Sequence, residues 1–395
     1  MQMYRPTTQP PRPSQAGQLS TGEMVEIART VAEARRFEGQ WQALADRALD
    51  ANPFLEPWCL IPALESYGQD RDICIAFVYS KGESERRLIG VFPLEQRRKF
   101  RGLPLRHLVS WLHPQTFFAQ PIIDPQHGEM AWAQLLDWAR GQGAQLIELP
   151  MVDAASATMA ALETTLANRK TKSATIASFK RALLRAGATT AAAYIAAGSS
   201  AKSRKSWRRQ NRRLGELGRL ECRVLGPEDP ADPWIEAFLR LEANSWKGHD
   251  GTALASHPHE ERFFREMAAA AHARKALHMM GLFLDGQPVA LQCNLFSGGD
   301  GFAFKVTFDA QYSALSPGVL LELAAIEDFF GRDGLRSVDS CTNAGHPLMG
   351  RLWSERRQID HQLVPTGRRE GRIICRLFPL AQSIRARLRR KGNTA

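Results

Sequence analysis

Residues 304–327 read FKVTFDAQYSALSPGVLLELAAIE, and this stretch combines the end of a strand, a loop and a long apolar helix. Aromatic and β-branched residues before Asp309 favour a strand. Ser316 is a typical N-cap, and Pro317 suits the first helical position because its missing N–H needs no partner there. Gly318 lets a ligand approach the backbone closely. The loop is either a plain helix start or a helix start that binds an anion, since unpaired N–H groups there carry partial positive charge.

Further strands and helices are predicted on both sides of this stretch, throughout the second half of the chain. We expect strands at 219–225, 277–284, 288–296, 301–308, 335–340 and 358–364, and helices at 202–213, 234–246, 260–273, 317–330 and 347–353. Asp285-Gly286 joins two of these strands and is a strong signal for a tight hairpin. The order is that of a mixed sheet with helices packed on it.

The first half repeats this order about 200 residues earlier, an offset that predicts two domains of ordinary size. Strands are expected at 24–29, 72–79, 87–94, 105–112, 145–149 and 175–181, and helices at 33–49, 56–66, 129–140 and 155–167. We predict a disordered tail at 1–22, an N-terminal domain at 23–185, a linker at 186–201, a C-terminal domain at 202–375 and a basic tail at 376–395. The small residues of the linker are also compatible with a helix over part of it.

Composition places the chain among globular proteins, since 44% of its 395 residues are hydrophobic and 24% are charged. No apolar run resembles a secretory signal or a membrane span, so we expect a cytoplasmic protein. The six cysteines form no CxxC pair, which argues against structural zinc and fits a reducing compartment. The net charge of +11 predicts an anionic partner.

Several strings resemble the CelD-like and FemAB-like branch of the GNAT acyltransferase superfamily. They are NPFLEPWCL (52–60), SRKSWRRQNRRL (203–214), LEANSWKGHDGTAL (241–254), the stretch 304–327, and Asp339 with the downstream RLW (351–353). The resemblance implies an α/β (α+β) fold of two tandem GNAT domains, each a mixed, mostly antiparallel central sheet flanked by helices. It also implies acyl transfer from a thioester donor, acetyl-CoA or a longer acyl-CoA, to an amine or hydroxyl.

The resemblance further implies that Ser316, Pro317 and Gly318 hold the pyrophosphate of the donor. The first half has HPQTFF (113–118) at the equivalent place, which is poorly suited to phosphate. We therefore expect the N-terminal domain to be degenerate and to form the acceptor side, while the C-terminal domain binds the donor and catalyses transfer.

Direct transfer needs a group that removes a proton from the acceptor and groups that stabilise the oxyanion. The catalytic candidates are Lys305, Asp309, Tyr312 and Asp339. Period-2 alternation places Lys305 with Ala303 and Thr307 on one face of its strand, opposite the aromatic residues, and this face lines the cleft or meets solvent. Asp309 and Asp339 are also common turn residues after strands.

Five further residues are candidates for binding the acceptor, a small molecule or a glycan- or lipid-linked group: Glu242, Trp246, Lys247, Arg351 and Trp353. Trp246-Lys247-Gly248 is equally well explained as the end of a helix, with Gly248 as its cap. No metal is expected: His257 and His259 lack a third ligand, and a GNAT mechanism needs no nucleophile from Cys341 beside His346.

The basic helix at 202–213 is either a solvated face or a contact for CoA phosphates, an acidic acyl carrier protein, an anionic membrane surface or RNA. Neither stacking aromatics nor a helix-turn-helix pattern accompanies it, so no DNA is expected. The chain is expected to be a monomer or a homodimer. Two other functions stay open, a non-catalytic GNAT-fold scaffold in a polysaccharide-synthesis complex and a tRNA-dependent aminoacyltransferase of the FemAB type.

Overall fold

The computed structural model describes residues 24–80, 86–185, 187 and 189–378. Its strands are β1 (Val25–Ala28), β2 (Ile73–Tyr79), β3 (Leu88–Arg97), β4 (His107–Ser110), β5 (Ile122–Ile123), β6 (Leu146–Asp153), β7 (Ala174–Arg185), β8 (Leu220–Val224), β9 (Leu277–Leu284), β10 (Gln287–Ser297), β11 (Asp300–Phe308), β12 (Ser337–Asp339) and β13 (Glu355–Pro365). Its α-helices are α1 (Val31–Arg35), α2 (Glu38–Ala45), α3 (Pro57–Tyr67), α4 (Gly128–Gly141), α5 (Ala157–Asn168), α6 (Ala191–Ala197), α7 (Ala201–Gly215), α8 (Asp232–Ala243), α9 (Trp246–His249), α10 (Pro258–Ala273), α11 (Pro317–Phe330) and α12 (Met349–Leu352). Short 3-10 turns are η1 (Pro53–Leu55), η2 (Leu254–Ser256) and η3 (Ala310–Leu315).

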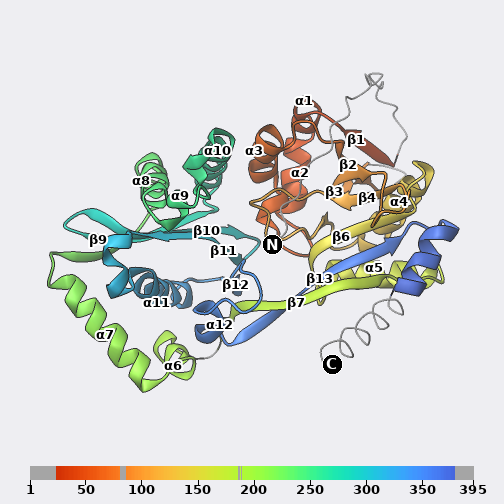
Figure 1. The fold of residues 1–395 in the computed structure, drawn as a ribbon. Coiled ribbons are helices and arrows are strands. Elements are labelled where there is room, and N and C mark those ends of the chain that lie inside the picture. The colour runs from red at the N-terminus through yellow and green to blue at the C-terminus, as the bar shows by residue number, and fades with distance from the viewer. Residues whose placement is uncertain (1–23, 81–85, 186, 188, 379–395) are drawn as a thin grey trace.

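All described strands belong to one sheet that runs through both halves of the chain (Figure 1). The order is β1-β2-β3-β4-β6-β13-β7-β12-β11-β10-β9-β8, with β5 beside β3. Two pairs within it are parallel, β4 with β6 and β11 with β12, and the others are antiparallel. The predicted fold class, a mixed and mostly antiparallel sheet flanked by helices, is confirmed.

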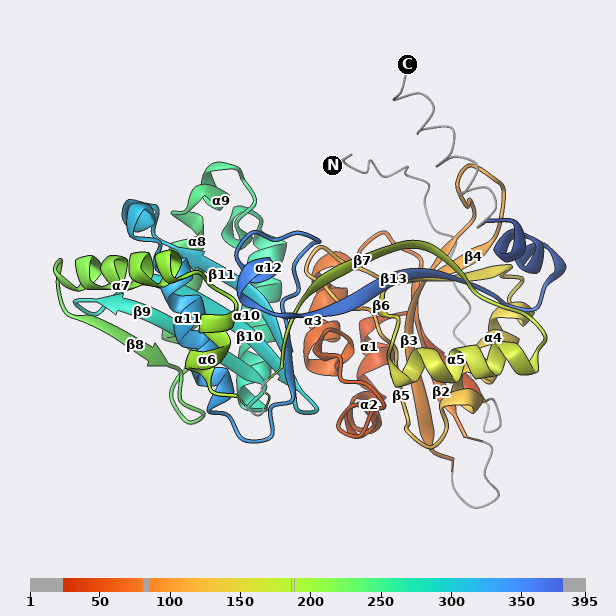
Figure 2. The same ribbon diagram turned by 90° about the horizontal axis from the view of Figure 1, so that it is seen from below.

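Strands β7 and β13 join the halves into this single sheet. β13, near the end of the described chain, pairs with β7 along one side and with β6 of the first half along the other. Figure 2 shows β7 and β13 crossing side by side from one half to the other. The sequence does not predict this exchange, because pairing between strands about 180 residues apart leaves no local pattern. The domain limits at 23–185 and 202–375 stay a prediction.

Within the expected linker 186–201, α6 is helical, which is one of the two alternatives left open by its small residues. The predicted N-terminal tail and residues 379–395 of the basic C-terminal tail lie outside the described residues. In the part of the chain that the structure describes, no helix is long and apolar enough to cross a bilayer.

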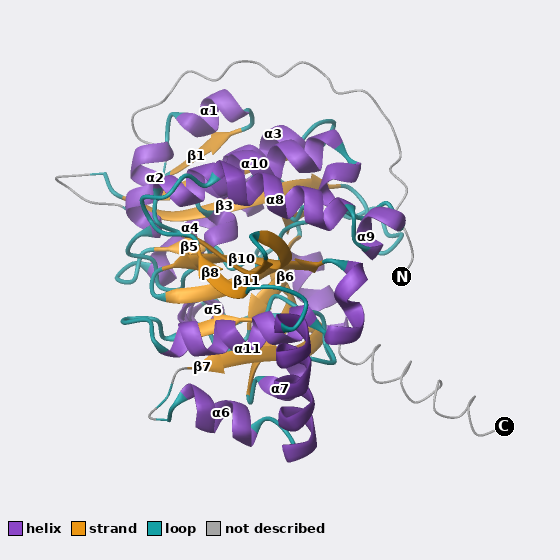
Figure 3. Cartoon of the chain, turned by 90° about the vertical axis from the view of Figure 1, so that its left-hand side faces the viewer, coloured by secondary structure: helices purple, strands orange, loops and turns teal. Residues whose placement is uncertain are grey.

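Helices cover both faces of the sheet, so the molecule has three layers (Figure 3). One face carries α1, α2 and α3 of the first half beside α8 and α10 of the second, and their apolar side chains form one continuous core. On the opposite face, α4 and α5 pack on the first half and α6, α7, α11 and α12 on the second. The shared core fixes the two halves against each other, with Phe54 of the first half in edge contact with Phe302 of β11.

Candidate functional site

A cavity of about 580 Å³ lies where β11 and β12 separate. These parallel strands pair only from Asp300 with Ser337 to Phe302 with Asp339. The residues that follow those last pairs, 303–308 on β11 and 340–342 after β12, line the cavity together with the start of α11. Where two strands separate, their main-chain groups are left without a partner strand and can contact a ligand. We therefore treat this cavity as the candidate active site.

A β-bulge in β11 turns Lys305 away from the predicted face. Cys293 of β10 pairs with Lys305 and Asn294 pairs with Ala303, so Phe304 is the extra residue. Ala303 packs on the α11 side of the sheet, whereas Phe304 and Lys305 both face the α8 side. The expected grouping of Ala303 with Lys305 is therefore wrong, because simple alternation fails wherever a strand carries an extra residue.

Lys305 and Lys247 line the cavity and share a buried carboxylate, Glu242 of α8. Oε1 of Glu242 accepts from Lys247 Nζ at 3.0 Å and lies 3.8 Å from Lys305 Nζ, while Oε2 accepts from the N–H of Leu254 at 2.9 Å. Lys247 Nζ also donates to the carbonyl of Val306 at 3.0 Å. Burial lowers the pKa of Lys305. Three of the predicted residues thus meet, with the two ammonium groups at the cavity and Glu242 holding them from behind.

The start of α11 forms another wall of the cavity, through Ser316 and Gly318. Ser316 has left-handed backbone angles, φ 52° and ψ 51°, and its side chain caps no N–H of α11. Its Oγ instead accepts from Nε2 of Gln210 on α7 at 3.0 Å. The predicted side-chain N-cap is therefore wrong, because the hydroxyl points to α7. Pro317 is buried in the first turn of α11, as its position predicts.

Two features of the cavity walls suit a ligand. A Cβ added to Gly318 would lie 3.2 Å from the ring of Phe308, so only glycine leaves this wall open without displacing a neighbour. Thr307 of β11 also lines the cavity, is 3% exposed, and has a buried hydroxyl without a hydrogen-bond partner among the described residues. A buried hydroxyl without a partner is costly, so this one is placed to bond a ligand.

Glu322 of α11 is a candidate functional residue that the sequence reasoning missed. It is 5% exposed and is the one carboxyl group among the described residues that line the cavity. Its Oε1 accepts from the indole Nε1 of Trp353 at 2.8 Å. Burial without a cationic partner raises the pKa of Glu322 to about 8. The available signal was an acidic residue at position 322 inside the apolar helix 317–330, where a carboxylate is expensive unless it has a task.

Asp339 does not line the cavity. Its carboxylate is 1% exposed and is bound by Nε of Arg181 at 2.7 Å and Nη1 of Arg357 at 2.8 Å. It also accepts from the N–H of Cys341 at 2.8 Å, in a turn where Cys341 has a positive φ of 52°. Both arginines come from strands that cross between the halves, β7 and β13. Its evident task is to hold β12 in the joined sheet.

The remaining predicted residues are dispersed. Asp309 caps η3 through the N–H of Gln311, and Tyr312 packs beside the core under α11, so neither lines the cavity. Trp246 begins α9, and its side chain lies outside what the structure describes. Trp353 is buried behind Glu322 and positions it, while Arg351 lines a second cavity nearby. Their predicted catalytic and acceptor-binding roles remain predictions.

The basic helix α7 lies against η3 and the start of α11, next to the main cavity. Trp207 and Leu214 pack on the core, and six of its basic residues are exposed: Lys202, Lys205, Arg208, Arg209, Arg212 and Arg213. Its described ion pair is that of Arg212 with Glu216. Most of the positive charge of α7 thus has no ion-pair partner among the described residues.

No group of three or more His, Cys, Asp or Glu residues in the described ranges is arranged to hold a metal. The rings of His257 and His259 lie 5.8 Å apart, at the start of α10. Burial raises the pKa of Cys341, which disfavours the thiolate that a nucleophile requires.

Comparison with known proteins agrees with this geometry. Residues 201–346 match the family model of the acetyltransferase (GNAT) domain, and this match supports an acyltransferase. The structure of FemX is similar, with a TM-score of 0.53 and 10% identity over 82% of this chain and 95% of that one. The C-terminal domain of a protein from Agrobacterium fabrum, described as a lysylphosphatidylglycerol synthetase, has a TM-score of 0.50 and 12% identity over 86% and 94%.

A conserved protein of unknown function from Bacteroides thetaiotaomicron VPI-5482 has a TM-score of 0.51 and 11% identity over 87% of this chain and all of its own, 100%. At these identities the likeness shows the fold. No curated protein sequence matches this chain.

Proposed function

We propose that the protein transfers an acyl group from a thioester donor, acyl-CoA, to an amine or hydroxyl acceptor in the cavity between β11 and β12. The observation that carries the proposal is the placement of Glu322, Lys305 and the open start of α11 around one cavity. Together they supply a proton acceptor, a positive charge and a place for an anionic donor. The match of residues 201–346 to the GNAT family supports the same reaction.

The ionised carboxylate of Glu322 takes the proton from the acceptor as its nitrogen or oxygen attacks the thioester carbonyl carbon. The new C–N or C–O bond forms as the C–S bond breaks, and the proton passes to the departing thiolate. Lys305 stabilises the negative charge that develops on the carbonyl oxygen, a role for which a fixed cation in a partly dry cavity is well suited. Lys247 and Glu242 keep that cation in place.

The residues present fit an acyl-CoA donor. The open wall at Gly318, the N–H of Gly318 and the positive end of the dipole of α11 suit its pyrophosphate. A hydrogen bond from Gln210 to Ser316 links α7 to the start of α11. The exposed cations of α7 suit the remaining phosphate of the CoA donor. The unpartnered hydroxyl of Thr307 lies along the wall of β11, where it can bond an amide of the pantetheine arm.

The test is the thermal unfolding of the protein with and without millimolar acetyl-CoA or a long-chain acyl-CoA. Binding to the native state alone adds about 2.7 kcal/mol at a hundredfold excess over Kd. We expect wild type and Gly39→Trp, an exposed control on α2, to be stabilised, and Gly318→Trp to melt unchanged by the donor. Thr307→Val, which keeps the shape, should weaken the shift without altering the unliganded melting temperature by much.

A second candidate is aminoacyl transfer from tRNA, which the exposed charge of α7 beside the cavity favours. FemX and the C-terminal domain described as part of a lysylphosphatidylglycerol synthetase have a similar fold, so a tRNA donor should be tested beside acyl-CoA. Under this alternative no acyl-CoA stabilises the protein, and tRNA binds with an affinity that falls steeply with salt. If neither donor binds, the protein is better explained as a scaffold.

The resemblance of the sequence to the CelD-like branch leads us to propose acceptors of cell-envelope or polysaccharide synthesis. Deletion of the gene, followed by analysis of envelope glycans for a lost acyl group, tests this class of acceptor.

A further inference from the structure

Two basic stretches that lie far apart in the sequence meet at one end of the molecule. The first is the hairpin connection at 98–106, between β3 and β4, and the second is a helix at 369–378, after β13. The guanidinium carbon of Arg101 lies 4.7 Å from the ring centre of Phe378. One apolar cluster joins the two stretches, through Phe100, Leu105, Ile374, Cys375 and Phe378.

One side of the 369–378 helix is fixed against the sheet. A Cβ added to Gly371 would lie 2.0 Å from the carbonyl oxygen of Gln145, so only glycine lets the helix approach the start of β6 this closely. Cys375, one turn later, is 5% exposed. Because residues three and four apart share a face of a helix, the other face is left to solvent. It carries Arg369, Arg372, Ile373, Arg376 and Leu377, all of them exposed.

The 98–106 hairpin presents the same combination of cations and an aliphatic side chain. Phe100 and Leu103 exchange main-chain hydrogen bonds of 3.0 and 2.9 Å, and Arg101 and Gly102 between them have positive φ of 48° and 88°. Two such residues in succession are typical of the tight turns that join β-strands, so this turn sets the position of Leu103. The exposed cations of the hairpin are Arg98, Lys99, Arg101 and Arg106.

Positive charge dominates this end of the molecule. None of the exposed cations of the hairpin and the helix has an ion-pair partner among the described residues, and Glu370 is the one acidic residue in the sequence of the two stretches. Such a concentration of charge attracts an anionic partner. The sequence from 379 to 395 adds further cations without an acidic residue, namely Arg385, Arg387, Arg389, Arg390 and Lys391.

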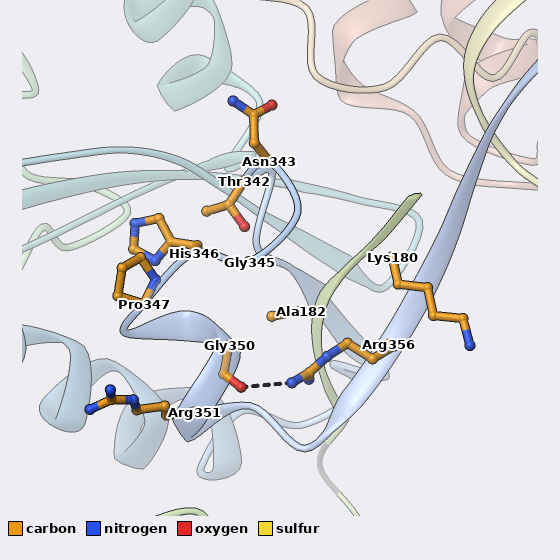
Figure 4. A pocket seen from close by; sticks show the side chains of 10 residues that line it. All are labelled: Lys180, Ala182, Thr342, Asn343, Gly345, His346, Pro347, Gly350, Arg351 and Arg356. Carbon is orange, nitrogen blue, oxygen red and sulfur yellow. Dashed lines mark hydrogen bonds between the residues drawn. The ribbon is translucent and has the colours of Figure 1, made fainter. Parts of the chain in front are cut away.

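The cations around the cavity between β7, β13 and the loop before α12 are arranged differently (Figure 4). The charged ends of Lys180 and Arg351 point to opposite sides there, and the guanidinium of Arg356 donates to the carbonyl of Gly350 at 2.7 Å. The cations of the hairpin and the helix instead flank exposed aliphatic side chains, which gives this surface a second kind of contact.

The aliphatic side chains favour a lipid surface over a nucleic acid. Leu103, Ile373 and Leu377 are 57%, 48% and 52% exposed. The aromatic rings of these stretches, Phe100 and Phe378, pack in the apolar cluster, so they form no platform on which bases stack. A bilayer with anionic lipids offers negative charge at its surface and acyl chains beneath, where aliphatic side chains leave water.

We propose that the 98–106 hairpin and the 369–378 helix together dock the protein on a membrane that contains anionic lipids. Their cations bind the headgroups, while Leu103, Ile373 and Leu377 enter the boundary between headgroups and acyl chains. Figure 2 shows the 369–378 helix, in dark blue, at the opposite end of the molecule from α7. The proposal does not depend on acyl transfer, and it concerns a surface other than the basic helix α7.

The test is co-sedimentation of the full chain with vesicles of phosphatidylcholine alone or of phosphatidylcholine with phosphatidylglycerol. We expect wild type to bind the second kind only. Ile373→Ser/Leu377→Ser keeps the charge and should weaken binding by about tenfold or more, because the remaining cations hold the surface by charge alone. Leu217→Ser, at a residue that is 56% exposed and follows α7, is the matched control and should bind within about twofold of wild type.

A second pair of variants tests the charge. Arg372→Gln/Arg376→Gln should also weaken vesicle binding by about tenfold or more, whereas Arg208→Gln/Arg209→Gln on α7 should stay within about twofold of wild type. The melting temperature of each protein without vesicles shows whether its fold is intact. Leu103→Ser on the hairpin replaces the helix variants if these melt early, and it should weaken binding as well.

Four results overturn the proposal. Wild type binds both kinds of vesicle alike or neither, the variants of the helix bind as wild type does, the α7 variant loses as much binding as they do, or wild type binds poly(U) RNA and no vesicle. The third result assigns the membrane contact to α7, and the fourth assigns the surface to nucleic acid. None of these results depends on whether acyl-CoA stabilises the protein, so failure of the proposed acyl transfer is read separately.

Discussion

Replacing Glu322 with Gln tests whether this carboxyl group beside the cavity is protonated in the native state at neutral pH. The side chain is 5% exposed, and burial raises its pKa from 4.5 to about 8. Between these values the native state holds a proton that the unfolded state has lost. Stability must therefore fall as pH rises through this window, by about 1.4 kcal/mol for each pH unit.

Glu322→Gln removes this titration and keeps the shape and the hydrogen bond from Trp353. The free energy of unfolding of wild type minus that of the variant should fall by about 3–4 kcal/mol between about pH 5 and pH 8. Urea unfolding of both proteins at several pH values measures it, because the other titrating groups cancel in the difference. Glu266→Gln, at an exposed position on α10, is the matched control.

A difference that stays flat with pH would refute the reasoning, since Glu322 would then titrate in the native state as it does in the unfolded chain. The reaction gives a second reading. Loss of a proton acceptor lowers turnover by about 10²–10⁴-fold. Trp353→Phe removes the N–H that favours the carboxylate, so its rate profile should move to higher pH and not collapse.

The remaining predictions concern charge. Asp339→Asn leaves two buried guanidinium groups without their full partner and should destabilise the protein by about 3–5 kcal/mol in urea unfolding, whereas Asp137→Asn, at an exposed pair, should cost about 1 kcal/mol or less. Lys305→Met should lower kcat by about tenfold or more with little change in the donor-induced melting shift, and an equal loss in both would make Lys305 a binding residue. Arg208→Glu combined with Arg209→Glu should weaken donor binding and flatten its salt dependence; unchanged affinity at low salt would exclude α7 from the donor site.

The sequence alone determined several local elements of this protein. β9 and α11 begin and end at the residues their patterns predict, 277–284 and 317–330, because mostly apolar runs with Asp-Gly after the strand and Ser-Pro-Gly at the start of the helix carry their own limits. It failed where a helix is interrupted or a strand is very short. The predicted helix 33–49 is α1 and α2, broken at Arg36 and Phe37, and β5 is too short to leave an alternation.

The start of α11 and Lys305 were predicted for the site because each has a strong local pattern, a helix start or a lysine among aromatics. The placement of Glu322 at the cavity and the shared carboxylate role of Glu242 were decided by tertiary structure. Each depends on residues brought together from distant strands and helices, and Lys305 reaches Glu242 only because Phe304 bulges from β11. The position of a residue in a helix or strand predicts which face its side chain is on. The pKa and the partners of that side chain depend on the residues that pack around it. The exchange of β13 into the first half is the largest such effect, since hydrogen bonds between strands far apart in sequence leave no trace in either strand.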